Sequence, residues 1–283
     1  MKKIGIIDYF IDEWHSNTYL GLFKKATEEL GLDYIVSYAY AEIDCFENRL
    51  TTDEWCKENN VERCYSIEEL CEKSDNILIL SPANPEKHLL YAKTALRYKK
   101  ATYIDKTFAE NVDVAKEIYQ IANTYGTKIF STSALRYAEE LDGLDNVNSV
   151  VITGGGRSIE EYIVHQIEMA VKLMGENAKT VRLFDRGNHS TVIVDFDGKL
   201  ATLNYSYGAP FVVDASIKDK SPAIYLPITK NNYFDRLIKD ILTFFESQTP
   251  PFDYRQTITV IAVRDAIIKA KALPFGQVVE VVK

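Results

Sequence analysis

Residues 76–107 of the chain are NILILSPANPEKHLLYAKTALRYKKATYIDKT. An apolar run, a helical segment that opens on a proline, and a second β-rich run predict a strand, a crossover helix and a parallel strand. Upstream, KIGIIDYF and YIVSYAY have the same β-rich character, and between them lies a helix that we expect Ser16 or Asn17 to open and Gly31 to end. Downstream, a helical pattern over 112–125 precedes TKIFST. This alternation predicts an α/β fold with a doubly wound parallel sheet.

The pattern changes after about residue 135, where short alternating runs replace the strand and helix repeats. These runs are TVRLF, STVIVDF, LATLNYSY, FVVDASI and AIYLPI, with turn residues between them. Helices are expected over about 159–174, 233–247 and 256–272. We therefore predict a doubly wound domain over 1–135 and an α+β domain with an open, mainly antiparallel sheet over 136–283.

Composition excludes several classes of function. The 283 residues include 41 Asp and Glu against 33 Lys and Arg, a formal net charge of −8. Nucleic acids and anionic membranes repel such a charge, so we expect a small-molecule partner, no nucleic acid and no membrane. Acidic residues at positions 8, 12 and 13 interrupt the stretch that a signal peptide would need, and we expect a cytoplasmic protein.

The four cysteines form no metal or redox motif. Cys45, Cys56, Cys64 and Cys71 are 11, 8 and 7 residues apart, without a C-x-x-C pair. Metal ligands and disulfides are the alternatives, but a chain of this length can bury a core without either. We predict four reduced thiols.

Polar side chains follow the predicted parallel strands, at the edge where such sheets bind ligands. The residues at these strand ends are Asp8, Tyr9, Phe10, Ser81, Pro82, Asn84, Asp105 and Lys106. Lys106 is the candidate for chemistry, and the alternative is a solvated lysine in a turn. Asn84 precedes a proline, so we expect it to cap a helix.

A second candidate pair lies on the helix expected over 159–174. Glu161 and His165 are four residues apart and therefore share a helix face. A carboxylate at this offset can orient an imidazole for acid–base chemistry. The alternative is an exposed pair without a function.

These residues carry a resemblance to the family of glucose-fructose oxidoreductase and inositol dehydrogenase (Gfo/Idh/MocA). In that family a strand ending in T-P-x-x-x-H precedes a helix and then a strand ending in E-K-P, and Asp105-Lys106-Thr107 stands at the place of E-K-P. GGGRSIEEYIVHQIEMAVKLMG, residues 154–175, is similar to the glycine-rich turn followed by D-x-G-x-H-x-x-D, with Glu161, His165 and Glu168 at the D, H and D positions. The closing YFDRLIKDILTFFESQTPPF also matches, so the resemblance covers nearly the whole chain.

The resemblance implies a Rossmann-type first domain and an NAD(P)-dependent oxidoreductase that acts on a sugar or polyol. It implies that His165 takes a proton from a hydroxyl, that Lys106 hydrogen-bonds the substrate oxygen, and that Glu161 orients His165. The residues that would line the cofactor are Asp8, Tyr9, Phe10, Ser81, Pro82, Asn84 and Asp105. It also implies a homo-oligomer that pairs through the C-terminal sheet.

The chain departs from the family at the nucleotide loop. The family has G-x-G-x-x-G after its first strand, but this chain has Asp8-Tyr9-Phe10-Ile11-Asp12-Glu13. The second strand ends without the usual acid, and Glu42 and Asp44 are the nearest. These differences favour an alternative function, a carbohydrate-binding or regulatory protein, or a lyase or isomerase, that has lost dinucleotide binding.

Two other polar or glycine-rich segments have alternative interpretations. The loop with Asp8, Asp12, Glu13, His15 and Asn17 has groups that bind divalent cations or sugar hydroxyls, but we expect a solvated loop and no metal. The three glycines at 154–156 are a phosphate cradle or a strand-to-helix turn, and we predict the turn.

Overall fold

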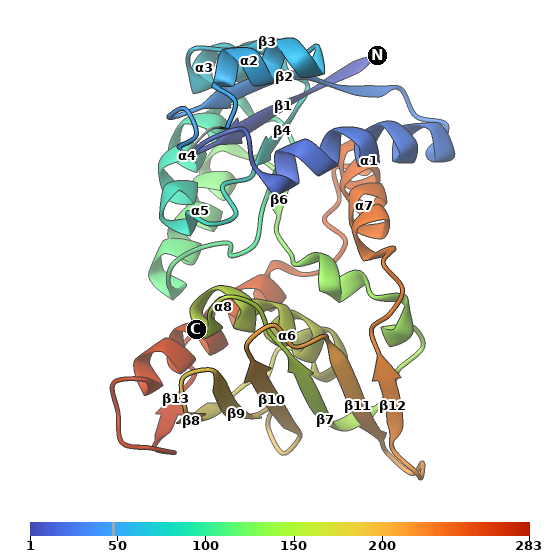
Figure 1. Cartoon of the computed structure of the whole chain (residues 1–283), viewed down its shortest axis with the longest axis vertical. Helices are drawn as coiled ribbons and strands as arrows, with labels where there is room; N and C mark the ends of the chain where they lie inside the picture. The colour runs from blue at the N-terminus through green and yellow to red at the C-terminus, as the bar shows by residue number, and fades with distance from the viewer. Residues whose placement is uncertain (47–48) are drawn as a thin grey trace. The chain divides into compact units, whose positions relative to one another are not determined.

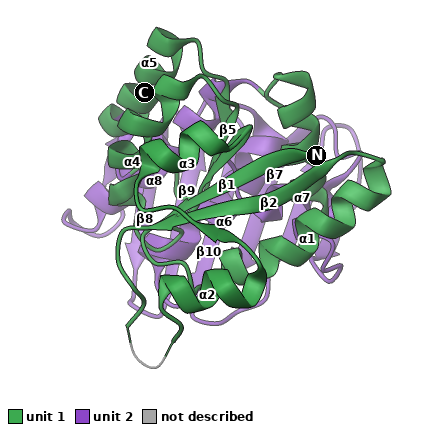
Figure 2. Ribbon diagram, turned by 90° about the horizontal axis from the view of Figure 1, so that it is seen from above, with its two compact units in different colours: residues 1–109, 113–131, 235–252 green, residues 110–112, 132–234, 253–283 purple. Residues whose placement is uncertain are grey.

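The chain forms two compact units in a computed structural model that describes residues 1–46 and 49–283 (Figure 1). Figure 2 colours them separately. Unit 1 comprises residues 1–109, 113–131 and 235–252, and unit 2 comprises 110–112, 132–234 and 253–283. The change of unit after Ser131 lies near the expected boundary at 135. The assignment of 235–252 to unit 1 differs from the expected division, because the apolar side of this helix packs on the first sheet.

Unit 1 contains a six-stranded parallel sheet in the order β3-β2-β1-β4-β5-β6. Its strands are β1 (Lys2–Asp8), β2 (Tyr34–Ala41), β3 (Glu62–Arg63), β4 (Asn76–Ile79), β5 (Thr102–Ile104) and β6 (Ile129–Phe130). The order reverses between β1 and β4, which defines the point where doubly wound sheets bind ligands. The predicted fold class of this half is confirmed, but the two-residue β3 and the helix over 52–59 were not predicted.

Helices cover both faces of this sheet (Figure 1). They are α1 (Trp14–Leu30), α2 (Thr52–Asn59), α3 (Ile67–Lys73), α4 (His88–Ala95), α5 (Val112–Tyr125) and α7 (Tyr233–Ser247). Helices α1 and α7 share one face, where Lys25 pairs with Asp235 and Lys239 with Glu29. Helices α4 and α5 lie on the other face. The ring of Phe244 contacts Phe130 of β6, with centroids 4.9 Å apart, which holds α7 in this unit.

Unit 2 contains a seven-stranded mixed sheet in the order β12-β11-β7-β10-β9-β8-β13. Its strands are β7 (Val147–Gly154), β8 (Thr180–Asp185), β9 (His189–Asp195), β10 (Leu200–Ser206), β11 (Val212–Ile217), β12 (Ile224–Pro227) and β13 (Val278–Glu280). Only β7 and β10 pair in parallel among the described strands of this sheet. The prediction of an open, mainly antiparallel sheet is therefore confirmed.

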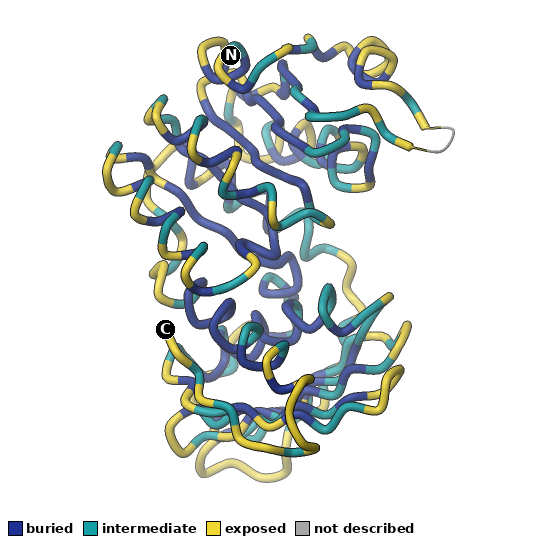
Figure 3. Tube along the Cα trace, turned by 90° about the vertical axis from the view of Figure 1, so that its left-hand side faces the viewer, coloured by how far each residue is buried: buried dark blue, intermediate teal, exposed yellow. Residues whose placement is uncertain are grey.

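One face of the second sheet is covered by α6 (Ile159–Met174) and α8 (Tyr254–Ala270). The strands alternate between buried and accessible residues, as in β9, where Ser190, Val192 and Val194 are buried and the residues between them are not. Figure 3 shows this alternation along the strands. Period-2 burial leaves the second face of the sheet accessible in the single chain.

Burial also accounts for the cysteines. All four are free thiols, and Cys56, Cys64 and Cys71 are buried in unit 1. Burial raises the pKa of the Cys56 and Cys64 thiols to about 11, and that of Cys71 to about 12, so these three are unreactive core residues. Separately, the described residues include no helix that is long and apolar enough to cross a membrane.

Candidate functional site

The carboxyl edge of the first sheet is organised around the buried side chain of Asp8, the last residue of β1. One oxygen, Oδ1, accepts the backbone N–H groups of Tyr9 (2.7 Å) and Ser81 (3.0 Å) and the Ser81 hydroxyl (3.3 Å). The other, Oδ2, accepts the hydroxyl of Ser16 (3.1 Å). Burial raises the pKa of Asp8 well above its ordinary value, and the nearby charge of Glu13 raises it further. The structure thus brings together Asp8 and Ser81, two of the strand-end residues predicted for the cofactor.

The N-terminus of α1 is capped by Glu13, and not by Ser16 or Asn17 as expected. The Glu13 side chain accepts the backbone N–H of Ser16 at 2.7 Å, and the helix begins at Trp14. The hydroxyl of Ser16 is held by Asp8 instead, and the side-chain oxygen of Asn17 accepts the indole N–H of Trp55. The expectation was wrong because Glu rarely caps helices, whereas Ser and Asn do so commonly.

Glu13 also holds the imidazole of His15. Its Oε2 lies 3.1 Å from Nδ1, and Nε2 on the other side of the ring lies 3.7 Å from Oδ2 of the buried Asp105. Burial by itself raises the pKa of Glu13, but the hydrogen bonds from His15 and Ser16 outweigh it and lower the pKa below its ordinary value. Glu13 is therefore the ionised member of the Asp8 and Glu13 pair.

Aromatic side chains take the place of glycines in the turn between β1 and α1. Tyr9 and Phe10 are half-buried, with ring centroids 5.9 Å apart, and Ile11 is buried. The ammonium of Lys87 lies 4.8 Å from the centre of the Tyr9 ring and 2.5 Å from Glu42. Large side chains therefore occupy the turn at positions where a G-x-G-x-x-G loop leaves its backbone exposed to the ligand.

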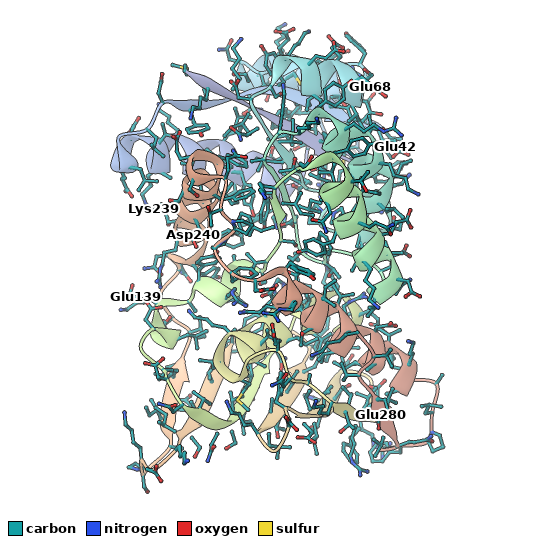
Figure 4. The ribbon with its side chains drawn as sticks, turned by 180° about the vertical axis from the view of Figure 1, so that it is seen from behind. Glu42, Glu68, Glu139, Lys239, Asp240 and Glu280 are labelled. Atoms are coloured by element: carbon teal, nitrogen blue, oxygen red, sulfur yellow. The ribbon has the colours of Figure 1, made fainter. Side chains whose placement is uncertain are left out.

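Glu42, labelled in Figure 4, follows β2 directly. Its backbone N–H donates to the carbonyl of Asp8, and its carboxylate binds the ammonium of Lys87 and the hydroxyl of Tyr91. The sequence left open whether this acid lies too far along the chain. It lies beside the end of β1, where doubly wound folds hold ribose hydroxyls with an acidic residue.

Lys106 follows β5 and is buried, with 8% of its surface exposed. Its ammonium donates to the carbonyl oxygen of Pro82 at 3.2 Å, and its peptide bond to Thr107 is cis. This burial does not match the alternative of a solvated lysine in a turn. Pro82 and Lys106, both predicted site residues, therefore meet in unit 1.

The other two strand-end residues have local partners. The side chain of Asn84 donates to Glu86, and it makes no capping bond to the single turn of 3-10 helix at Pro85–Lys87. Asn84 therefore stands at the N-cap position before Pro85, as expected, but its side chain does not cap the turn. Oδ1 of Asp105 accepts the hydroxyl of Tyr103 at 3.0 Å, which fixes this carboxylate within the core of unit 1.

In unit 2, the half-buried His165 lies on α6 with Nδ1 only 2.6 Å from the hydroxyl oxygen of Ser133. Glu161, one turn earlier, accepts the guanidinium of Arg157 at 2.6 Å. The rings of Tyr162 and Phe211 pack against the imidazole, with centroids 5.5 and 6.0 Å away. The predicted Glu161 and His165 thus share a helix, but the contact to Nδ1 comes from Ser133.

A buried ion pair supports the segment that carries Ser133. The carboxylate of Glu168 accepts the backbone N–H of Ser133 (3.2 Å), the hydroxyl of Thr132 (3.2 Å) and the guanidinium of Arg136 (3.4 Å). Burial raises the pKa of Glu168, although the charge of Arg136 opposes this. Sequence reasoning missed Ser133 and Arg136, because a contact across 32 residues leaves no periodic signal in the chain.

The three glycines at 154–156 are explained by close packing. A Cβ on Gly155 would lie 2.1 Å from the backbone oxygen of Ser206, and one on Gly156 would lie 2.2 Å from the ring of Tyr162. None of the three has a positive φ. Their role is therefore to join β7 to α6 without steric overlap, which matches the predicted turn.

The β1–α1 turn, in the arrangement present, does not fit a pyrophosphate at the N-terminus of α1. That position holds the carboxylate of Glu13, and Asp8 takes the N–H groups of Tyr9 and Ser81. The order of the sheet and the position of Glu42 do fit the nucleoside parts of a dinucleotide. No group of three or more His, Cys, Asp or Glu side chains among the described residues is arranged to hold a metal ion.

Comparisons with known proteins identify the fold. No family model and no curated protein matches the chain. Three similar solved structures are a probable dehydrogenase from Thermotoga maritima (16% identity, TM-score 0.79), an oxidoreductase from Agrobacterium radiobacter in complex with NAD+, L-tartaric acid and magnesium (10%, 0.81), and myo-inositol dehydrogenase from Lactobacillus casei in complex with NAD(H) and myo-inositol (11%, 0.80). The matches cover 99%, 99% and 100% of this chain, and 98%, 98% and 97% of those chains. The chain thus has, over its whole length, the fold of these dehydrogenase and oxidoreductase structures, the fold that its sequence predicted.

Proposed function

We propose that the protein is an oxidoreductase that transfers hydride between NAD(P) and a hydroxyl-bearing carbon of a sugar or polyol. The observation that carries the proposal is the buried Lys106 at the carboxyl edge of a six-stranded sheet of dehydrogenase type. Burying an ammonium costs free energy unless the group has a role or a partner, and a single carbonyl at 3.2 Å is a weak partner. The solved structures that share the fold include complexes with nicotinamide cofactors and with a polyol or a hydroxy acid.

Lys106 and His165 supply groups with complementary chemistry. Lys106 donates a hydrogen bond to the reacting oxygen of the substrate and stabilises negative charge on it. His165 takes the proton of the substrate hydroxyl in the oxidation direction and returns it in the reduction direction. Ser133 holds Nδ1 of the imidazole, whereas Glu161, to which the family resemblance gives the orienting role, pairs with Arg157.

The dinucleotide would accept or supply the hydride. Glu42 at the end of β2 is the residue that would bind the ribose hydroxyls. The remaining predicted residues of this site are Tyr9, Phe10, Ser81, Pro82, Asn84 and Asp105.

A second candidate function is favoured by one observation. The anionic cap at Glu13 suits a protein that binds a sugar without a dinucleotide, either as a carbohydrate-binding or regulatory protein or as a lyase or isomerase. Such a protein would use Lys106 and His165 on the same substrate class. It differs from the first candidate in having no affinity for NAD(P).

We further propose a homo-oligomer that pairs through the accessible face of the second sheet. This face carries threonines and apolar side chains, for example Val151, Thr191 and Ile193. A face of this composition suits an interface between identical chains.

We also propose that the protein is cytoplasmic, because its buried reduced thiols suit that compartment.

Cofactor titration tests the proposed function. Trp14 is half-exposed next to Glu13, so bound NADH or NADPH should quench its emission, and calorimetry should give the same affinity. No binding up to millimolar concentration would remove the dehydrogenase function and leave the second candidate. With an active substrate, Lys106→Ala and His165→Ala should each abolish turnover in a folded protein, and full activity in either variant would refute its assignment.

A further inference from the structure

We propose that the Glu13 carboxylate occupies the anion site at the N-terminus of α1 and competes there with the pyrophosphate of the dinucleotide. The inference rests on the proposed function, because it concerns the same cofactor. It predicts that the natural protein binds NAD(P) weakly and that loss of this one charge strengthens binding.

Glu13 lies at the N-terminus of α1. A helix N-terminus attracts anions because its first N–H groups have no partner within the helix and the helix dipole adds positive potential. In α1 the Ser16 N–H donates to Glu13 Oε1 at 2.7 Å, so this donor is already used by an anion of the chain itself. Glu13 is buried, with 7% of its surface exposed, and so its charge is poorly screened by solvent.

Glu13 is held at both oxygens, because Oε1 accepts the N–H of Ser16 and Oε2 lies 3.1 Å from Nδ1 of His15. A pyrophosphate at this helix end must either displace the Glu13 side chain and break these contacts, or lie beside a like charge. Both effects weaken binding, because contacts of the chain are lost in the first case and like charges repel in the second.

Glu13 is the competing group in preference to Asp8. Asp8 is the last residue of β1 and already accepts hydrogen bonds from Tyr9, Ser81 and Ser16, whereas Glu13 accepts a backbone N–H of α1 itself. Glu13 carries the charge at the helix end. A single neutral substitution at Glu13 should therefore be sufficient.

The experiment compares Glu13→Asn with Glu13→Asp by calorimetric titration with NADH. Both Asn and Asp are good helix caps, so the two variants keep the cap and differ in charge. We expect the Asn variant to bind NADH at least about tenfold more tightly than the Asp variant and the natural protein, because only it removes the repulsion. Glu28→Gln is the control, because it removes one exposed charge at the other end of α1. Circular dichroism and urea unfolding establish that each variant is folded.

The outcomes separate this inference from the proposed function. Equal affinity in the natural protein and both variants would overturn the inference and leave the dehydrogenase function standing. Binding by the Asn variant alone would support the inference and overturn NAD(P) dependence for the natural protein. Absence of binding in every folded variant would overturn both, and tighter binding in the Glu28→Gln control would assign the effect to net charge and overturn the inference.

Discussion

Removal of the Ser133 hydroxyl tests how His165 is held. In the Ser133→Ala variant, Nδ1 of His165 loses a contact of 2.6 Å, and the backbone N–H of Leu135 loses the cap that accepts it at 3.2 Å. Each lost hydrogen bond or cap costs about 1 kcal/mol, so we expect the free energy of unfolding to fall by about 2 kcal/mol. For a protein of 283 residues that corresponds to a decrease in Tm of about 3 °C.

Thermal unfolding and NMR titration of the histidine ring measure the two consequences. Ser133→Ala should lower Tm and shift the titration of His165, whereas Ser133→Thr keeps the hydroxyl and should change the titration little. Glu161→Gln separates the roles, because Glu161 pairs with Arg157 and its loss should leave the His165 titration near that of the natural protein. The reasoning is refuted if Ser133→Ala leaves both Tm and the titration unchanged. A large effect of Glu161→Gln would assign the orienting role to the carboxylate.

Three further predictions follow from other residues. Burial raises the pKa of Asp8, so the folded protein binds a proton at this carboxylate more tightly than the unfolded chain does. The stabilising effect of that proton is lost as the pH rises through the raised pKa. The free energy of unfolding then falls by up to about 1.4 kcal/mol per pH unit. Asp8→Asn should therefore flatten the pH dependence of urea unfolding between the ordinary pKa of an aspartate and the raised pKa of Asp8, and an unchanged slope would contradict the assignment. The carboxylate of Glu42 repels a 2′-phosphate, so the natural protein should bind NADH more tightly than NADPH in a titration. Glu42→Gln should reduce that preference. Tighter binding of NADPH by the natural protein would refute this role of Glu42. Gly155→Ala places a Cβ 2.1 Å from a backbone oxygen and should lower the free energy of urea unfolding by about 2 kcal/mol or more. Gly21→Ala is the control, because a Cβ there has no atom within 4 Å and should stabilise α1. Equal effects of the two substitutions would contradict the packing account.

Sequence periodicity was sufficient for most of the fold. The run Lys2–Asp8 and the helix Ile159–Met174 were predicted because their apolar residues follow one clear period. Strand β3 was missed because two residues carry no periodic signal. Helix α7 was predicted as a helix, but nothing local indicates that its apolar face packs in unit 1, since this depends on contacts such as Phe244 with Phe130.

The candidate site was predicted in part, for a related reason. Lys106 and His165 were found because they stand in motifs with fixed spacing. Ser133 lies outside any motif, and only the folded chain brings it to Nδ1 of His165. The cap at Glu13 was missed because local preference favours Ser16 or Asn17, whereas tertiary contacts from Asp8 and Trp55 hold those two side chains elsewhere.

Formation of NADH from NAD+ in the presence of sugars and polyols tests the central claim most directly. The natural protein, incubated with NAD+ or NADP+ and a panel of polyols, aldoses and hydroxy acids, should produce an absorbance at 340 nm with at least one substrate. Lys106→Ala, at the same protein concentration, should produce none. Absence of signal across the panel, together with absence of NADH binding at millimolar concentration, would contradict the assignment as a dehydrogenase.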